Sequence, residues 1–263
     1  MGGQYGWNAQ ILRQTDKMGV VQIWNGTANL TLAMTNGATF EAGAVAPGEI
    51  VTIFGDQISA PGLTKMALDP DGNVTKILAE TRVLFDGVAA PLIYVSQNQI
   101  SAVAPYSLAG KSTAELQVEY KGKLTKQVVL PVVGTAPGLF TLDSSGRGQG
   151  AILNQDYSVN GASNPATGGD IVILYGTGEG QTSTAGVDGK PAVGTYPKPL
   201  AEVSVTIGGQ TAEVLYAGAA PYFVAGVYQI NARVPKGLTP GAAQVKVKIG
   251  DNESPGVVTV AVK

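Results

Sequence analysis

The sequence of this 263-residue chain carries one pattern twice, in the same order. Residues 50–55 (IVTIFG) correspond to 171–176 (IVILYG), 83–94 (VLFDGVAAPLIY) to 205–216 (VTIGGQTAEVLY), and 99–105 (QISAVAP) to 229–235 (QINARVP). Because three separate matches keep their order, we interpret them as two tandem copies of one domain. The repeated positions are apolar residues and turn formers, which are typical of a scaffold. We therefore expect the function mainly in the unrepeated parts.

Composition indicates that both copies are built from strands. The chain contains 36 Gly and 15 Pro, and only 14% of its residues are charged. This profile is typical of many short strands joined by tight turns. The predicted strands are 50–54, 81–85, 91–95, 99–103, 113–120 and 126–133 in the first copy, and 151–154, 170–175, 202–207, 212–216, 227–234, 243–249 and 257–262 in the second.

About seven strands in each copy predict an all-β protein of two tandem immunoglobulin-like β-sandwiches. The predicted organisation is an N-terminal β-arm over residues 1–34, a first immunoglobulin-like domain over 35–135, and a second over 136–263. The region 176–199 is expected to be a long loop without a counterpart in the first domain.

Several classes of function are disfavoured by composition. The net charge is −2 and Lys and Arg do not cluster, which argues against a nucleic-acid partner. No run of 18 apolar residues predicts a transmembrane helix. The chain has no Cys and no His, so thiol chemistry, imidazole bases and Cys or His metal ligands are absent. We expect no cofactor.

The carboxylates show no catalytic pattern. We therefore predict that the protein is not an enzyme and has no catalytic residues. No pairing is visible in the sequence among the acid–base candidates Glu41, Glu49, Asp86, Asp156, Asp170, Glu179 and Glu202. Residues 69–80 resemble a calcium loop in their acidic spacing. However, Val74 stands where that loop requires Gly, and a simple turn explains the same residues. We therefore predict no metal site.

Several motifs resemble one bacterial family. They are NGATF at 36–40, VAPGEIVTIFG at 45–55, QNQI at 97–100, APGLF at 136–140, GQGAILNQD at 148–156, NPA at 164–166, YGTG at 175–178 and YQIN at 228–231. Together they are similar to an uncharacterised tandem β-domain family found at the C-termini of large secreted proteins, especially of acidobacteria. The IPT/TIG immunoglobulin-like domains are a more distant resemblance.

This resemblance covers residues 35–263. It implies a bacterial origin, export and an extracellular or cell-surface location, and it supplies no catalytic residues. The residues after Met1 show no charged-then-apolar signal pattern. From the residues alone, the chain is therefore expected either to stay in the cytoplasm or to begin after processing.

The segment 20–34 has strong β-character outside the repeat, with an Asn25-Gly26 turn between two apolar stretches. A lone hairpin is marginally stable in water, so this arm is expected to join a sheet. One alternative is its own first domain. The other is the sheet edge of a neighbouring subunit, which would build a head-to-tail filament. The expected interface residues are Val20, Val21, Ile23, Trp24, Leu30, Leu32 and Met34.

The leading functional hypothesis is a structural subunit of an extracellular filament, with other copies of the same chain as partners. The alternative is a secreted adhesion module that binds surface glycans or surface proteins. It would use the loop 176–199 and the candidate ligand-binding aromatics Tyr196, Tyr222 and Phe223, which lie beside Pro and Gly. Packing within the protein is the other explanation for these aromatics.

Overall fold

A computed structural model describes residues 32–263, which consist of β-strands, loops and one short 3-10 helix, η1 (Tyr106–Leu108). The prediction of an all-β protein is confirmed. Within this described part of the chain, no helix has the length and apolar character needed to cross a membrane.

The first group of strands, which we call the N-terminal unit, forms two sheets. Its strands are β1 (Ala33–Asn36), β2 (Ile50–Phe54), β3 (Thr64–Lys65), β4 (Thr81–Phe85), β5 (Val88–Ala89), β6 (Leu92–Ser96), β7 (Gln99–Val103), β8 (Thr113–Tyr120), β9 (Lys123–Leu124) and β10 (Val128–Pro131). One sheet has the order β1-β2-β7-β6-β3. The other has the order β10-β8-β4-β5, with β9 paired to β8.

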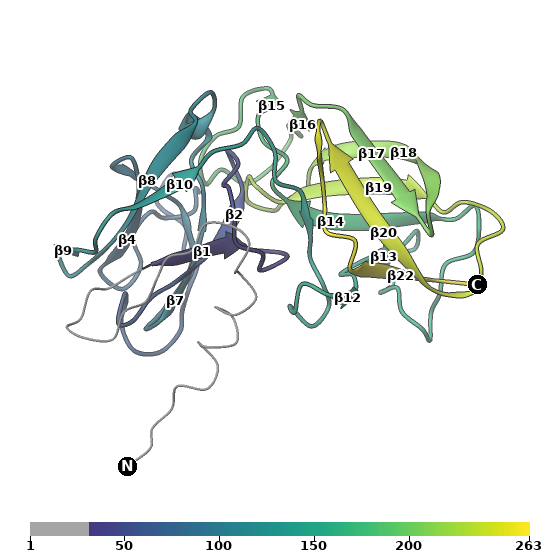
Figure 1. Ribbon diagram of the computed structural model, residues 1–263, viewed down its shortest axis with the longest axis horizontal. Helices are drawn as coiled ribbons and strands as arrows, with labels where there is room; N and C mark the ends of the chain where they lie inside the picture. The colour runs from purple at the N-terminus through teal and green to yellow at the C-terminus, as the bar shows by residue number, and fades with distance from the viewer. Residues whose placement is uncertain (1–31) are drawn as a thin grey trace, which may run out of the picture.

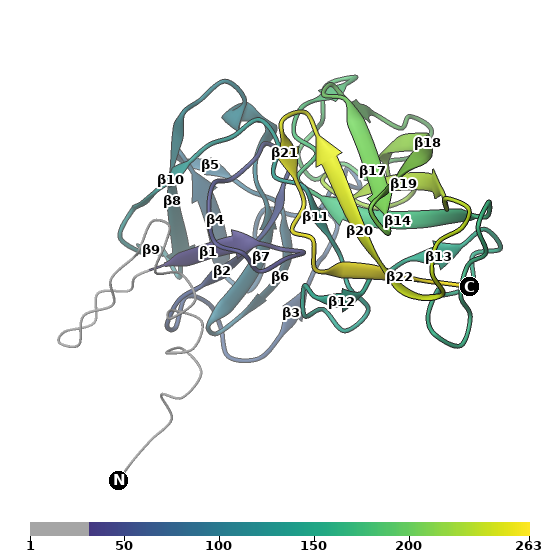
Figure 2. The same ribbon diagram turned by 45° about the vertical axis from the view of Figure 1, so that its right-hand side comes forward.

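The remaining strands form the C-terminal unit. They are β11 (Gly138–Leu139), β12 (Gly148–Gln149), β13 (Leu153–Asn154), β14 (Ile171–Thr177), β15 (Thr182–Ser183), β16 (Lys198–Pro199), β17 (Val203–Ile207), β18 (Gln210–Ala219), β19 (Tyr228–Arg233), β20 (Gly241–Ile249), β21 (Asn252–Glu253) and β22 (Val258–Val262). The main sheet runs β11-β14-β19-β18-β17-β20-β22-β12, and β15 pairs with β16. The two units lie side by side, and the C-terminus is in the second of them (Figures 1 and 2).

The two units repeat the same strand order. The series β2-β7-β6 corresponds to β14-β19-β18, and β4-β8-β10 corresponds to β17-β20-β22. The short hairpins also match, because β9 pairs with β8 as β21 pairs with β20. Each unit has a register shift at the equivalent place, between Leu92 and Tyr94 in β6 and between Val214 and Tyr216 in β18.

One proline accounts for one difference between the repeats. Strand β18 continues without a break where the N-terminal unit has two strands, β5 and β6. Pro91 lies between β5 and β6, at the position that Glu213 occupies in the second repeat. Proline has no backbone N–H for the ladder, so the strand is interrupted there.

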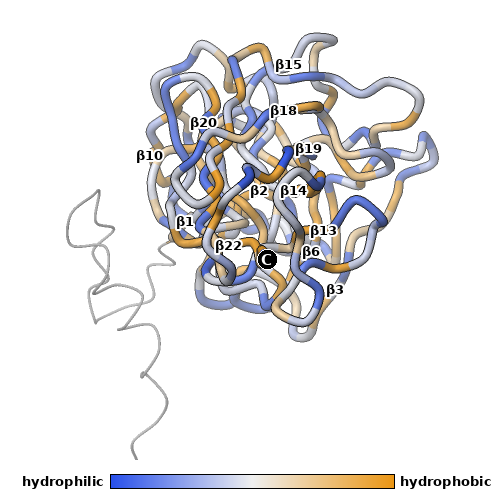
Figure 3. The backbone as a smooth tube through the Cα atoms, turned by 90° about the vertical axis from the view of Figure 1, so that its right-hand side faces the viewer, coloured by the Kyte–Doolittle hydropathy of each residue, from blue (hydrophilic) through white to orange (hydrophobic). Residues whose placement is uncertain are grey.

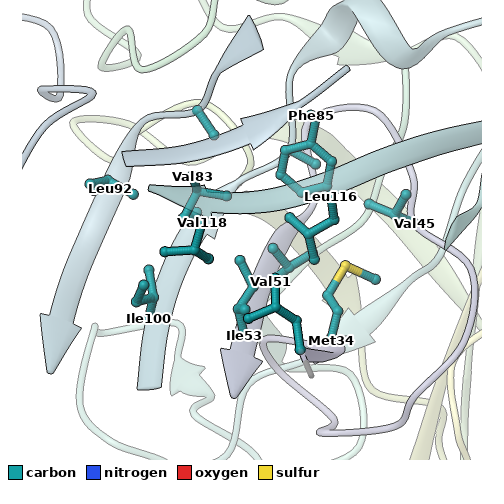
Figure 4. Close-up of a cluster of buried hydrophobic side chains, with 14 of the residues drawn as sticks. Met34, Val45, Val51, Ile53, Val83, Phe85, Leu92, Ile100, Leu116 and Val118 are labelled. Atoms are coloured by element: carbon teal, nitrogen blue, oxygen red, sulfur yellow. The ribbon is translucent and has the colours of Figure 1, made fainter. Parts of the chain in front are cut away.

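Each unit has its own hydrophobic core, which in the N-terminal unit lies between its two sheets. In the N-terminal unit, Val51, Ile53 and Ile100 pack against side chains of the opposite sheet such as Phe85 and Leu116 (Figure 4). The C-terminal unit has a separate core built from alternate residues of β14, β19, β17, β20 and β22. The hydropathy trace in Figure 3 shows this pattern as hydrophobic stretches within strands such as β22 and hydrophilic segments in outer loops.

Candidate functional site

The last residues of the predicted arm, Leu32 and Met34, belong to the core of the N-terminal unit. Val20, Val21, Ile23, Trp24 and Leu30 lie outside the described residues. The sequence predicts that Leu32 and Met34 contact another subunit, but their side chains are only 0% and 5% exposed. Met34 belongs to β1, which pairs antiparallel with β2 of the same chain, and Figure 4 shows it among the core side chains.

The assignment of Leu32 and Met34 is therefore corrected: both stabilise their own unit. Residue 34 is also not the end of an independent arm, because β1 continues to Asn36. The alternation of apolar residues in 27–34 could not reveal this, since a strand paired within the chain and one paired with a neighbour have the same periodicity.

The three predicted aromatic residues lie in loops of the C-terminal unit. Tyr196 is 38% exposed, Tyr222 77% and Phe223 50%. The ring of Phe223 lies 5.7 Å from that of Tyr175 in β14, in a tilted arrangement. Tyr222 has a φ of 67°, a conformation that few non-glycine residues adopt. These side chains are available to a ligand, and Phe223 is also anchored by a neighbouring ring.

The segment 176–199, predicted to be a long loop, contains the end of β14 and the short strands β15 and β16, and part of it contacts the N-terminal unit. The amide of Val74 donates to the carbonyl of Gly189 at 2.8 Å, so the loop lies against the N-terminal unit. Its Asp188 carboxylate accepts the backbone N–H of Tyr106 at 2.9 Å. The Gln181 side chain donates to the Tyr106 carbonyl at 2.9 Å.

Further hydrogen bonds connect the strand cores of the two units. The N–H of Ile50, at the start of β2, donates to the Thr177 hydroxyl at the end of β14, at 2.7 Å. The Asn36 side-chain amide donates to the carbonyl of Ala136 in the connecting segment at 3.0 Å. An apolar cluster that includes Ile50, Val103 and Val227 closes the contact. We call this contact between the units the junction.

Close backbone approaches require glycine at the junction. A Cβ on Gly178 would lie 1.9 Å from the carbonyl oxygen of Ala136, and a Cβ on Gly226 would lie 2.3 Å from that of Gly48. The ring of Tyr106 is enclosed similarly, since a Cβ on Gly186 would lie 2.2 Å from it. A side chain cannot be accommodated at such distances without movement of the backbone or the ring. The glycine-rich sequence 176–180 thus permits close packing.

Two buried carboxyl groups occupy the junction. Glu49 is 0% exposed and Glu179 is 3% exposed. Glu49 Oε1 accepts from the Asn36 amide at 2.8 Å, and Oε2 accepts from the N–H of Ala46 at 2.7 Å. Glu179 Oε2 has no hydrogen-bond partner within the described part of the protein.

Burial dominates the titration of these two groups. It raises the pKa of Glu49 to about 8, against the opposing effect of the hydrogen bonds from Ala46 and Asn36, and the charge of Glu179 raises it further. Burial likewise raises the pKa of Glu179 to about 8. Tyr106 and Tyr228 lie near enough for the Glu179 charge to add to the burial that raises their pKa values. Burial therefore favours the uncharged form of both carboxyl groups.

Sequence reasoning listed Glu49 and Glu179 but saw no pairing between them. They lie at opposite ends of equivalent strands, Glu49 before β2 and Glu179 after β14, so comparison of the repeats does not bring them together. Only the packing of one unit against the other does. The one available signal was their flanking glycines, Gly48, Gly178 and Gly180. Buried at the junction, the pair is enclosed from any external substrate.

The calcium-like residues form a turn. Asp69 Oδ1 accepts from the backbone N–H groups of Asp71 and Asn73, at 3.0 and 2.9 Å. Among residues 32–263, no group of three or more acidic side chains is arranged to bind a metal ion.

An open polar groove of about 520 Å³ lies beside Asn154, Asp156 and Lys263. Asp156 accepts from the N–H and hydroxyl of Ser158, so it supports a loop there.

Comparison with known proteins gives little further information. No family model and no curated protein matches the chain. Among solved structures, the chain is similar to one described as "Structure of surface layer protein SbsC, domains 4-9", with 16% sequence identity and a TM-score of 0.21. The match covers 90% of this chain and 31% of the other. A TM-score at this level carries no argument about fold or function.

Proposed function

We propose that this protein is a non-catalytic structural subunit of an extracellular bacterial filament, in which the N-terminal segment of one copy pairs with a neighbouring copy. We further infer that each unit is an immunoglobulin-like sandwich of the tandem family that the motifs resemble. The observation that carries the proposal is the junction, because it favours a rigid pair of units over two units that move independently on a flexible linker.

Stiffness follows from the chemistry of the junction. Its hydrogen bonds reach from the ends of β2 and β14, so a hinge motion between the units would break contacts anchored in both sheets. Bending would also expose Glu49 and Glu179 and separate the close approach of Gly226 to Gly48. A filament transmits load from subunit to subunit, and a rigid block suits this purpose.

The position of β1 supports assembly through the preceding residues. Among residues 32–263 it is the edge strand of the β1-β2-β7-β6-β3 sheet, and on the side away from β2 it has a single bridge, between Thr35 and Ala42. A largely open edge and a β-rich segment are the two components of strand addition between subunits. Burial of apolar side chains such as Ile23, Trp24 and Leu30 in a neighbour would contribute about 1.5–3 kcal/mol each.

Deletion of residues 1–31 is expected to convert polymers into folded monomers. The deletion must stop before Leu32, because that side chain lies in the core. Sedimentation velocity and negative-stain images would compare the intact and shortened chains, and far-UV circular dichroism would verify the fold. An intact chain that remains monomeric at high concentration would contradict the proposal.

A pair of charge substitutions tests the same contact without shortening the chain. Leu30→Asp places a charge on the apolar side of the predicted strand, whereas Asn29→Asp places it on the polar side. We expect only Leu30→Asp to prevent polymerisation. If both variants polymerise as the parent does, the apolar side of this segment is not the subunit contact.

A further inference from the structure

The outward face of one sheet carries similar residues at equivalent positions of the two units. In the N-terminal unit, Phe54 of β2 stands opposite Gln99 of β7, and in the C-terminal unit Tyr175 of β14 stands opposite Gln229 of β19. Tyr94 and Tyr216 are equivalent in the same way, paired with Ser101 and Asn231 respectively. The neighbouring Ile53, Ile100, Leu174 and Ile230 are buried, so the alternating residues of this set point outward.

Polar contacts fix the side chains of this face. Gln99 Nε2 donates to the Tyr94 hydroxyl at 2.6 Å in the N-terminal unit. In the other unit, Gln229 Nε2 donates to Asn231 Oδ1 at 2.8 Å, and the Tyr216 hydroxyl donates to the carbonyl of Ala219 at 2.7 Å. Rings and amides held in this way lose little conformational entropy when a ligand binds.

The two outward faces meet at the junction. Ile93 of β6 and Tyr175 of β14 pack on the same apolar cluster, together with Val224. Phe223 adds its half-exposed ring beside Tyr175. The two sets of aromatic and amide side chains therefore lie on sheets that share one apolar cluster, and we call the two sets together the aromatic–amide face.

Core packing explains why the buried residues recur in both repeats, but it does not explain the outward ones. A surface strand tolerates most polar residues, whereas here each unit has a Tyr, a Gln and a second aromatic residue at equivalent outward positions. Charged residues in register with the face stand at its margins: Lys65 on the edge strand β3, and Arg233, which is paired to Glu213 at 2.8 Å. The middle of the face is uncharged.

We propose that the aromatic–amide face binds a neutral polysaccharide. Aromatic rings pack against the apolar faces of sugar rings, and amide and hydroxyl groups exchange hydrogen bonds with sugar hydroxyls. An uncharged face matches a neutral ligand. Two equivalent sets in one rigid block match a ligand that is itself repetitive, and simultaneous occupation of both raises the overall affinity. This inference does not depend on filament formation.

Affinity electrophoresis of the full chain in gels containing hydroxyethylcellulose, laminarin, galactomannan or amylopectin tests the proposal. We expect retardation in at least one of these gels. Gln99→Ala and Gln229→Ala should each weaken binding about 3- to 10-fold, as loss of one or two hydrogen bonds predicts. The double variant should weaken it about 10- to 100-fold, because it affects both members of a bivalent site. Gln210→Ala, at the exposed first residue of β18, is the matched control and should bind as the parent does.

Two outcomes would overturn the proposal. The first is migration of the parent chain at the same rate in all four gels and in the polymer-free gel. The second is equal retardation of the double variant and the parent, which would place any saccharide site elsewhere. In the first case, if the double variant also loses the self-association that the parent shows, the face is a contact between copies of the chain.

Discussion

Gly178→Ala is expected to lower the free energy of unfolding by about 3–5 kcal/mol, which combines the cost of a non-glycine residue at positive φ with that of severe overpacking. The φ of Gly178 is +87°, and its new methyl group would lie 1.9 Å from the carbonyl oxygen of Ala136. That carbonyl accepts from Asn36, whose amide also donates to Glu49. Displacement of Ala136 therefore disturbs the junction as well as the end of β14.

Gly194→Ala is the matched control for this prediction. Gly194 also has a positive φ, +73°, but a Cβ there meets no atom within 4 Å. It should cost only about 1–2 kcal/mol, the strain of the left-handed conformation alone. Urea unfolding followed by circular dichroism measures both variants. Equal destabilisation would mean that the close approach to Ala136 does not contribute to stability.

The second large effect is a loss of stability with rising pH. A carboxyl group whose pKa is higher in the folded chain than in the unfolded chain contributes stability that is complete below about pH 4.5 and disappears as the pH rises to about 8. Each such group changes the free energy of unfolding by about 1.4 kcal/mol per pH unit within that window. From pH 5 to 8, Glu179 alone should account for about 3–4 kcal/mol.

Glu179→Gln should remove most of this dependence. The amide stays neutral, and the pKa of Glu49 should fall because the charge of Glu179 no longer raises it. The variant should match the parent near pH 5 and exceed its stability at pH 8. The control is Glu202→Gln, at an exposed position, which should keep the slope of the parent. Urea unfolding at intervals from pH 5 to 8 measures the slopes, and parallel curves for parent and Glu179→Gln would refute the burial argument.

The alkaline loss of stability should begin at the junction. Glu49 and Glu179 are buried at the contact between two units that have separate cores, so their ionisation should weaken this contact before it affects either core. Limited proteolysis is therefore expected to cleave the connecting residues 134–138 faster at pH 8 than at pH 6, relative to a loop far from the junction such as 121–123.

The sequence by itself determined the strands and their internal equivalence. The segments 50–54, 81–85, 99–103 and 113–120 are strands with the predicted bounds, because alternating or continuous apolar residues between turn formers specify a strand locally. The repeat likewise anticipated the common strand order. Short strands such as β3, β11 and β12 were missed, since a two-residue pairing depends on the neighbouring strand and leaves no periodic signal.

Only the tertiary structure decided how those strands are used. It put Leu32 and Met34 in the core of their own unit, although the same alternation fits pairing with another subunit. It brought Glu49 and Glu179 together across a sequence separation of 130 residues and placed part of the segment 176–199 against the N-terminal unit. A strand can be predicted locally, because its side chains alternate between two faces with a period of two residues. The contact between the units depends instead on the shapes and hydrogen bonds of segments that are far apart in the sequence and share no local pattern.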